Sequence, residues 1–288
     1  METSLTCNGI AFPENLSPII FQIGPIAPHW YGLGYVVGIL FAWWYGQFLL
    51  KKKALWPHNT PPMEPSKIGD FVVWAVLGVV VGGRLGEVFL YAPTYLASPL
   101  QVFAVWDGGM SFHGGLIGVL IAMTWFAHKN KIHYLGMFDT IAAGVPIGLG
   151  VVRICNFVNQ ELWGREIAKG TDVAWAVCFP RDPEYLPRHP SQIYEAFLEG
   201  FLLFIILAIL IFAFKALKRP GLICGVFTAG YGIGRIIAEF YRLPTYGYVQ
   251  EKLIGSWLTQ GMIYSIPMVI IGSIIIIYAL RHKITPVS

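Results

Sequence analysis

Seven long apolar runs make up most of this 288-residue chain, and they constrain its fold more than any other feature. Each run is roughly 17 to 25 residues long, the length that an α-helix needs to cross the hydrocarbon layer of a bilayer. The third run is short by this measure, and we expect its helix to start within the glycine-rich segment before His113. The runs lie at about 30–50, 71–91, 113–128, 137–155, 191–214, 221–241 and 257–280.

The composition points to the same class of protein. Hydrophobic residues make up 56% of the chain and charged residues only 12%, so a soluble fold would leave large apolar surfaces uncovered. The sequence therefore predicts an all-α, polytopic membrane protein with seven transmembrane helices, forming one integral-membrane domain over residues 1–288.

Basic residues are distributed unevenly between the two sides of such a bundle. One side holds eleven, in the loops after the first, third and fifth predicted helices and in the C-terminal tail: Lys51, Lys52, Lys53, Lys67, Lys129, Lys131, Lys215, Lys218, Arg219, Arg281 and Lys283. The other side holds six, and the first 29 residues hold none. By the positive-inside rule, the N-terminus is predicted to lie outside and the C-terminus in the cytoplasm. The net charge of +4 follows mostly from this topology, and no nucleic-acid partner is expected.

Three arginines lie inside predicted helices, where each costs roughly 2.5 to 3.5 kcal/mol on insertion scales. Counting about 1.5 Å per residue from the cytoplasmic side, Arg84, Arg153 and Arg235 lie about 21 to 24 Å along their helices, in the outer half. His113 falls in the same layer or just above it. Three cations and an imidazole in one layer could form a site for an anion.

These arginines have a second interpretation, as members of buried ion pairs that hold the helices together. The candidate acidic partners are Glu87, Glu195, Glu199 and Glu239. For Arg84 the two interpretations are about equally favoured, because Glu87 follows it by three residues. Arg153 has no acidic residue one turn away and opens onto a polar loop, which favours an anion site there. The guanidinium fork also matches two phosphate oxygens at a time.

His113 lies in the segment Trp106-Asp107-Gly108-Gly109-Met110-Ser111-Phe112-His113-Gly114-Gly115. An imidazole titrates near physiological pH, so His113 is the best candidate for a general base; the alternative is an interfacial histidine with satisfied hydrogen bonds. Ser111 is not favoured as a nucleophile, because the sequence places no third partner beside it. His189, just before the fifth predicted helix, is interpreted as a helix-start residue with a binding role.

Two predicted outer connections, 92–112 and 156–190, are longer than a tight loop requires, and long loops in compact proteins are often functional. Cys7 and Cys178 both map to the outer, oxidising side and could form a disulfide. Nothing in the sequence brings their loops together, so the pairing stays open. The cysteines show no metal-ligand spacing, and neither a metal nor an organic cofactor is expected.

Six stretches, in order along the first six predicted helices, carry most of these polar residues. They are His29-Trp30-Tyr31-Gly32-Leu33, Gly82-Gly83-Arg84, the ten residues around His113, Arg153-Ile154-Cys155-Asn156-Phe157-Val158-Asn159-Gln160-Glu161-Leu162-Trp163-Gly164-Arg165, Arg188-His189-Pro190-Ser191-Gln192-Ile193-Tyr194-Glu195 and Gly230-Tyr231-Gly232-Ile233-Gly234-Arg235-Ile236-Ile237-Ala238-Glu239-Phe240. In them the chain resembles the bacterial phosphatidylglycerol–prolipoprotein diacylglyceryl transferases. It departs from the family pattern at Val152 and Cys155, beside the arginine of the fourth helix, and at Gln160, where glycine is frequent. The charged and amide residues are intact, so these departures concern local packing.

The resemblance implies an enzyme of the bacterial inner membrane, with its site toward the outer leaflet. Such an enzyme moves the diacylglyceryl group of phosphatidylglycerol to the lipobox cysteine of a preprolipoprotein, forms a thioether and releases glycerol phosphate. Arg153 and Arg235 then correspond to the phosphate-binding arginines and His113 to the essential histidine, which either accepts the thiol proton or orients the substrate. The further candidate substrate-binding residues are Tyr31, Asn156, Glu161, Gly164, His189, Tyr231 and Glu239.

The alternative function is a membrane transporter or channel for an anionic solute. A transport path should continue to the cytoplasmic side, but the ionisable residues thin out below the outer half. No internal repeat is detectable either, whereas many transporters are built from repeats. The sequence therefore favours the enzyme.

Overall fold

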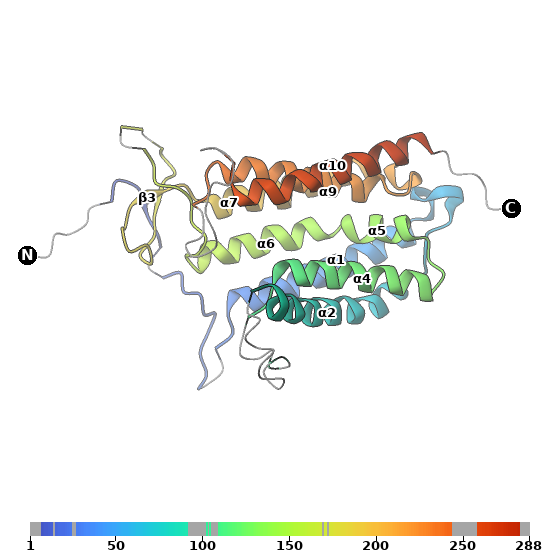
Figure 1. Cartoon of the computed structure of the whole chain (residues 1–288), viewed down its shortest axis with the longest axis horizontal. Coiled ribbons are helices and arrows are strands. Elements are labelled where there is room, and N and C mark those ends of the chain that lie inside the picture. The colour runs from blue at the N-terminus through green and yellow to red at the C-terminus, as the bar shows by residue number, and fades with distance from the viewer. Residues whose placement is uncertain are drawn as a thin grey trace, which may run out of the picture.

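The protein is an elongated bundle of helices with a small sheet at one end (Figure 1). This computed structural model describes residues 7–13, 15–24, 27–91, 102, 104, 109–168, 170–171, 173–243 and 258–282. Its α-helices are α1 (Trp30–Lys51), α2 (Lys67–Gly86), α4 (Phe112–Lys129), α5 (Tyr134–Ala142), α6 (Val145–Val158), α7 (Ser191–Glu195), α8 (Leu203–Phe212), α9 (Leu222–Glu239) and α10 (Gln260–Arg281). Two π-helical segments, η3 (Glu87–Tyr91) and η6 (Ala196–Leu202), continue α2 and α7, and single 3-10 turns lie at Lys53–Leu55, Pro57–Asn59 and Ala216–Lys218.

Six helical segments among the described residues are long and apolar enough to cross a membrane. They are Trp30–Lys51, Lys67–Phe89, Tyr134–Val158, Ser191–Phe212, Leu222–Glu239 and Gln260–Arg281. They confirm six of the predicted spans to within a few residues. The remaining predicted span corresponds to α4, an 18-residue helix that packs along α2. That α4 also crosses the membrane, and which end of the bundle faces outward, stay predictions.

The first turn of α4 confirms that its helix starts before His113, within the glycine-rich segment, and shows that the extension is one residue long. Ser111 has an extended backbone, and its hydroxyl accepts a hydrogen bond of 3.1 Å from the amide of Gly114, so it is the N-cap. The helix therefore begins at Phe112. Residues 105–108 of this segment, and residues 92–101 of the predicted outer connection, lie outside the described residues.

Close packing of α2 on α4 depends on glycine. Gly78 and Gly82 of α2 lie directly against the backbone of Gly118, and Gly82 also lies against Gly114. A Cβ atom at any of these positions would collide with the facing main chain. Small residues at this spacing let two membrane helices approach closely.

Two of the predicted spans are composite. The span at 137–155 is α5 followed by α6, with a short break before Pro146, which occupies the first turn of α6 where its missing amide costs nothing. The span at 191–214 is α7, η6 and α8. Its π-helical segment carries the buried Glu199, four residues after the buried Glu195 of α7.

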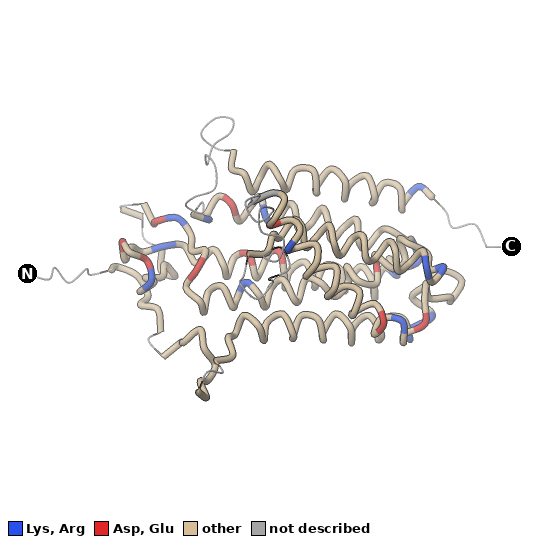
Figure 2. Tube along the Cα trace, turned by 60° about the horizontal axis from the view of Figure 1, so that its bottom comes forward, with Lys and Arg blue, Asp and Glu red and all other residues tan. Residues whose placement is uncertain are grey.

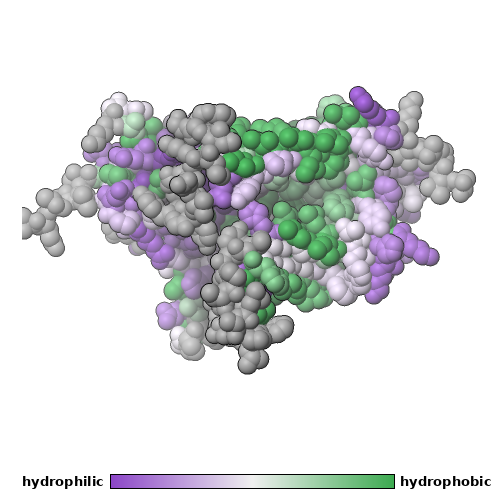
Figure 3. All heavy atoms as spheres, viewed as in Figure 1, coloured by the Kyte–Doolittle hydropathy of each residue, from purple (hydrophilic) through white to green (hydrophobic). Residues whose placement is uncertain are grey.

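Polar and apolar side chains are segregated along the bundle. Large hydrophobic side chains are exposed along the sides, for example Leu40 and Trp44 of α1 and Ile270 and Ile274 of α10. Figure 3 shows this apolar belt between two polar ends. Charged residues lie mostly at those ends, but Figure 2 also shows a group of both signs inside the bundle.

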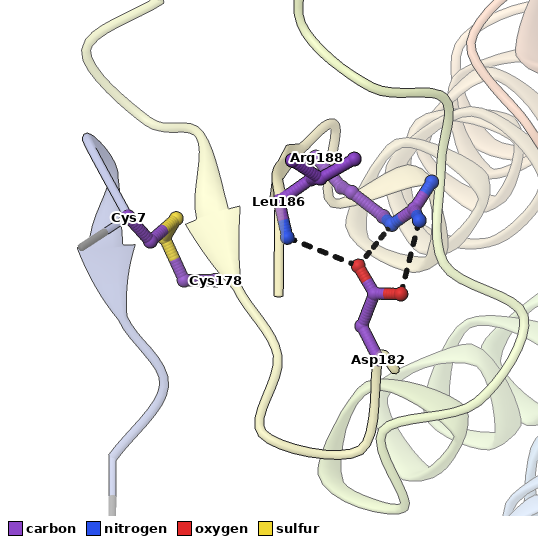
Figure 4. Close-up of a disulfide and its surroundings, with 5 residues drawn as sticks. All are labelled: Cys7, Cys178, Asp182, Leu186 and Arg188. Carbon is purple, nitrogen blue, oxygen red and sulfur yellow. Dashed lines mark hydrogen bonds and ion pairs between the residues drawn. A yellow bond between two sulfur atoms is a disulfide. The ribbon is translucent and has the colours of Figure 1, made fainter. Parts of the chain in front are cut away.

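The sheet lies at the end of the bundle where α6 ends and α7 begins (Figure 1). Its strands are β1 (Ile10–Ala11), β2 (Val177–Cys178) and β3 (Pro187–Arg188), with β1 parallel and β3 antiparallel to β2. A disulfide joins Cys7 to Cys178, which settles the pairing that the sequence left open (Figure 4). We call this sheet together with residues 159–190 the cap.

Candidate functional site

Arg153 of α6 and two carboxylates of the neighbouring helix form the centre of the internal charged group. Nε of Arg153 lies 3.0 Å from Oε2 of Glu195, and Nη2 lies 3.4 Å from Oε2 of Glu199. Glu195 ends α7 and Glu199 follows in η6, so both face α6 from one side. The sequence named both glutamates as candidate partners of the arginines, and the structure brings them to Arg153.

Arg235 of α9 meets the same glutamates from the other side. Its guanidinium forms ion pairs with Glu195 and, four residues along α9, with Glu239, and its Nη1 lies 3.9 Å from Oε1 of Glu199. Arg242, which follows α9, adds a third cation through a 2.8 Å contact from Nη1 to Oε1 of Glu195. We call Arg153, Arg235, Arg242, Glu195, Glu199 and Glu239 the arginine–glutamate cluster.

The acidic and the basic side chains of this cluster differ in solvent exposure. The side chains of Glu195 and Glu199 are fully buried, whereas those of Arg153, Arg235 and Arg242 are 19%, 15% and 11% exposed. The ion-pair contacts anticipated for Arg153 and Arg235 are therefore present. Part of each arginine side chain stays accessible, and the formal charges of the three arginines and the three glutamates cancel.

Glu239 connects the cluster to the start of α10. Its Oε2 accepts a 2.8 Å hydrogen bond from the hydroxyl of Thr259, while its other oxygen pairs with Arg235. The same hydroxyl oxygen accepts from the amide of Met262 at 3.2 Å, which makes Thr259 the N-cap of α10. Gly261 lies directly against the carboxylate, where a Cβ atom would collide with it.

His113 lies in the first turn of α4, half-buried, beside the same helix α10. The centroid of its ring is 5.1 Å from that of Tyr264, and the two rings meet edge to face. Tyr264 follows the N-cap Thr259 by five residues, and its hydroxyl accepts a 2.8 Å hydrogen bond from Gln260. The start of α10 thus contacts His113 through Tyr264, and Glu239 through Thr259 and Gly261.

Arg84, the third arginine of the predicted layer, is buried at the end of α2. Its Nε donates to the carbonyl of Val102 at 2.9 Å and its Nη1 to the carbonyl of Gly109 at 3.3 Å. These bonds hold the chain that leads into α4. None of these described bonds joins Arg84 to the arginine–glutamate cluster.

Asn156 and Glu161 meet at the end of α6. Nδ2 of Asn156 donates to Oε1 of Glu161 at 2.8 Å, and Nδ2 of Asn159 donates to the same oxygen at 3.3 Å. From α7, Nε2 of Gln192 donates to the main-chain carbonyl of Glu161 at 2.8 Å. Three amide side chains therefore bond to Glu161. Of these three, only Asn156 was named from the sequence as a candidate substrate-binding residue.

Gly164 occupies a position that no other residue can fill without moving the main chain. Its amide donates to the carbonyl of His189 at 2.9 Å, and a Cβ atom there would collide with the carbonyl oxygens of His189 and Tyr241. The neighbouring amide of Arg165 donates to the carbonyl of Tyr241 at 2.8 Å. Gly164 therefore ties the cap to the start of α7 and to the end of α9.

His189 itself lies against aromatic side chains. Its Nδ1 is 3.1 Å from the hydroxyl of Tyr194, and its ring meets that of Tyr241 edge to face at 5.1 Å. Burial lowers the pKa of the His189 imidazole below its ordinary value, which favours the neutral ring. His189 lies two residues before Ser191, the first residue of α7.

Tyr31 and Tyr231 complete the predicted set. The hydroxyl of Tyr31 accepts a 3.2 Å hydrogen bond from Tyr35, one turn later on α1. Tyr231 lies one turn before Arg235, packs against the bundle core, and interacts electrostatically with Glu199 and Arg153. Cys155, a departure from the family pattern, donates from Sγ to the carbonyl of Trp30 at 3.2 Å and so joins α6 to α1.

The cap contains a buried ion pair that the sequence did not single out. Nε of Arg188 lies 2.5 Å from Oδ2 of Asp182, and its Nη2 is 3.0 Å from Oδ1, a bidentate contact (Figure 4). The amide of Leu186 donates to the same carboxylate at 3.2 Å. The sequence analysis also missed Arg242 and Thr259. Arg242 could have been found from its position three residues after Glu239, and Thr259 from being a hydroxyl residue directly before an apolar run, which is typical of a helix N-cap.

Comparison with known proteins places the chain in a family. The family model for prolipoprotein diacylglyceryl transferase matches residues 18–278. The chain is 59% identical, over 98% of its length and 99% of the relative's, to the phosphatidylglycerol–prolipoprotein diacylglyceryl transferase of Bartonella bacilliformis. It is 56% identical to the enzyme of the same name from Brucella anthropi, over 94% of each chain. The family suggested by the sequence is thereby confirmed: the chain belongs to the prolipoprotein diacylglyceryl transferases.

Proposed function

We propose that this chain transfers the diacylglyceryl group of phosphatidylglycerol to the lipobox cysteine of preprolipoproteins, the first step of lipoprotein maturation. The observation that carries the proposal is the arginine–glutamate cluster, in which the carboxylates are buried and the arginine side chains are partly exposed. An anionic headgroup would therefore meet cations first. The names and high identity of the relatives support the same reaction and give no support to a transporter.

The reaction requires one bond to break and one to form. The cysteine sulfur attacks the glyceryl carbon that bears the phosphate, a carbon–sulfur bond forms, and the carbon–oxygen bond to phosphate breaks. Glycerol phosphate leaves with the electron pair of that bond, so negative charge grows on its phosphate oxygens. Arg153 and Arg235, held in place by Glu195, are preorganised to stabilise that charge where water is largely excluded.

The attacking thiol must also lose its proton, because the thiolate is the nucleophile. We propose that the imidazole of His113 accepts this proton. His113 lies in the first turn of α4 and contacts Tyr264. In the proposed topology the cap end of the bundle faces outward, and the site lies in the outer leaflet of the bacterial inner membrane. The lipid donor and the membrane-anchored signal peptide would both reach it from the bilayer.

The test is a transfer assay with purified protein, labelled phosphatidylglycerol and a lipobox peptide, scored for thioether product and glycerol phosphate. We expect Arg153→Ala and Arg235→Ala to lose transfer by at least about 100-fold, as removal of one preorganised donor commonly does, while still inserting into the membrane. Near wild-type transfer by either variant would remove that arginine from the phosphate site. His113→Gln keeps a hydrogen-bonding side chain but cannot take a proton, so full activity there would exclude His113 as the base.

A further inference from the structure

Three amide side chains next to the arginine–glutamate cluster have carbonyl oxygens without a hydrogen-bond partner among the described residues. They belong to Asn156, Asn159 and Gln192. Asn156 and Gln192 are buried almost completely, at 2% and 0% exposure. A buried acceptor that makes no hydrogen bond costs about 1 to 3 kcal/mol, so three together call for an explanation.

The orientation of these amides is fixed by their shared partner, Glu161. A carboxylate and a main-chain carbonyl are acceptors only, so each amide must turn its NH₂ group toward Glu161. Flipping any of the three would place oxygen against oxygen. Their carbonyl oxygens therefore point away from the oxygens of Glu161 that they bond, and each can bind only a hydrogen-bond donor; we call the three amides, all bonded to Glu161, the acceptor patch.

Two of these amides lie one helical turn from members of the arginine–glutamate cluster, on α6 and on α7. Asn156 follows Arg153 by three residues on α6, and Gln192 precedes Glu195 by three residues on α7. Three residues correspond to about 4.5 Å along a helix axis. The displacement is toward the cap, which is the direction in which a lipid headgroup would extend beyond its phosphate in the proposed topology.

We propose that Asn156, Asn159 and Gln192 bind the hydroxyl groups of the terminal glycerol of the lipid donor and thereby select a polyol headgroup. The inference rests on the proposed function, and it deepens that function by assigning the selectivity for the headgroup. Those hydroxyls stand on the two carbons beyond the phosphate ester, within reach of a patch one turn away. A headgroup without hydrogen-bond donors would leave these carbonyl oxygens unpaired.

The test compares phosphatidylglycerol with phosphatidylpropanol, which keeps the phosphodiester and an alkyl phosphate leaving group but has no headgroup hydroxyl. We expect kcat/KM for phosphatidylglycerol to be at least about tenfold higher, the effect of losing one or more hydrogen bonds. In Gln192→Met, which keeps the side-chain length, this ratio should fall toward one because turnover of phosphatidylglycerol drops while that of phosphatidylpropanol changes little. Asn159→Leu, at a less buried position, should act in the same way.

Asn130→Leu is the matched control. Asn130 is an amide at the opposite end of the bundle, bonded to Lys67 and to the carbonyl of Phe126, and its loss should leave the ratio unchanged. Equal turnover of the two lipids by the wild type would overturn the headgroup assignment while leaving the transferase function intact. An equal loss with both lipids in Gln192→Met and Asn159→Leu would show that the amides are structural, and would also overturn it. Absence of product from either lipid would overturn the proposed function, and this inference with it.

Discussion

The hydroxyl of Thr259 donates a 2.8 Å hydrogen bond to the carboxylate of Glu239, so the residue that begins α10 also holds the partner of Arg235. Thr259 lies outside every stretch that carries the family resemblance. It reaches the proposed phosphate site through a single intermediate carboxylate. Its role would be to position Arg235 rather than to touch the substrate.

We therefore expect Thr259→Asp to raise KM for phosphatidylglycerol more than it lowers kcat. Aspartate can still cap α10, but it cannot donate to Glu239 and would repel it, which draws Arg235 away from its place. Thr259→Ser keeps both hydrogen bonds and should restore wild-type kinetics. The measurement is a full kinetic analysis of both variants with lipid and peptide varied separately. A purely structural role would lower kcat with both substrates and leave the two KM values alone.

Gly164→Ala should destabilise the protein by about 1 to 3 kcal/mol, as overpacking in a close-packed site does, and should lower transfer. The added methyl group would push against the carbonyl oxygens of His189 and Tyr241, which separates the cap from α7 and α9. Thermal unfolding in detergent and the transfer assay measure the two effects. Gly69→Ala is the control, because there a Cβ atom would meet only the indole nitrogen of Trp43, at 3.6 Å, an ordinary contact. Unchanged melting of Gly164→Ala would contradict the steric argument.

Reduction of the Cys7–Cys178 disulfide should release the N-terminal segment from the cap while the membrane bundle stays folded. The bond closes a loop across 171 residues, and disulfides of this kind contribute about 2 to 5 kcal/mol. Maleimide labelling with and without reductant counts the thiols, and limited proteolysis follows the N-terminal segment. The paired substitution Cys7→Ala with Cys178→Ala should reproduce the reduced pattern. If reductant left proteolysis unchanged, the β1–β2 pairing alone would be sufficient to hold the segment.

The Asp182–Arg188 ion pair makes the stability of the cap depend on pH in one direction. Burial alone would raise the pKa of Asp182, but the hydrogen bonds from Arg188 and from two main-chain amides outweigh it and lower that pKa. A depressed carboxyl pKa stabilises the folded state fully above the unfolded value of about 3.9, and this stabilisation is lost as pH falls through the folded pKa. Hydrogen exchange of the cap in wild type and Asp182→Asn should therefore differ by a constant amount from pH 8 to 5 and converge in acid.

Glu184→Gln provides the comparison for that experiment. Glu184 also pairs with Arg188, at 2.7 Å, but its side chain is 63% exposed, so its loss should cost less than about 1 kcal/mol. A larger effect from Glu184→Gln than from Asp182→Asn would reverse the assignment of the main partner.

The helices could be predicted from the sequence because apolar length determines them almost directly. The expected spans at 30–50 and 191–214 correspond to Trp30–Lys51 and Ser191–Phe212. Hydropathy does not report hydrogen-bond register, however, so the π-helical Ala196–Leu202 was invisible. The break before α6 did have a signal, Pro146, which the apolar run obscured.

The site could be predicted only in part, for a related reason. Counting residues along helices placed Arg153 and Arg235 at one depth, but it does not report which faces meet. That Glu195 lies between three guanidinium groups depends on the rotation of each helix about its axis. The sheet of the cap was not predicted, because its strands are only two residues long and β1 pairs with a strand that is distant in the sequence.

The buried carboxylate of Asp139 has a consequence for the distant site. It lies in α5 and accepts hydrogen bonds of 2.7 and 2.8 Å from the amides of Gly221 and Cys224, where α9 begins. Arg153 follows Asp139 by fourteen residues, and Arg235 follows Gly221 by fourteen. Two paths that run in the same direction, one through α5 and α6 and the other through α9, are thus joined at this junction and reach their arginines after the same number of residues. The similar depth of the two arginines along the bundle therefore follows from their equal distance in sequence from that junction. Inserting a residue into one path alone would shift one arginine relative to the other.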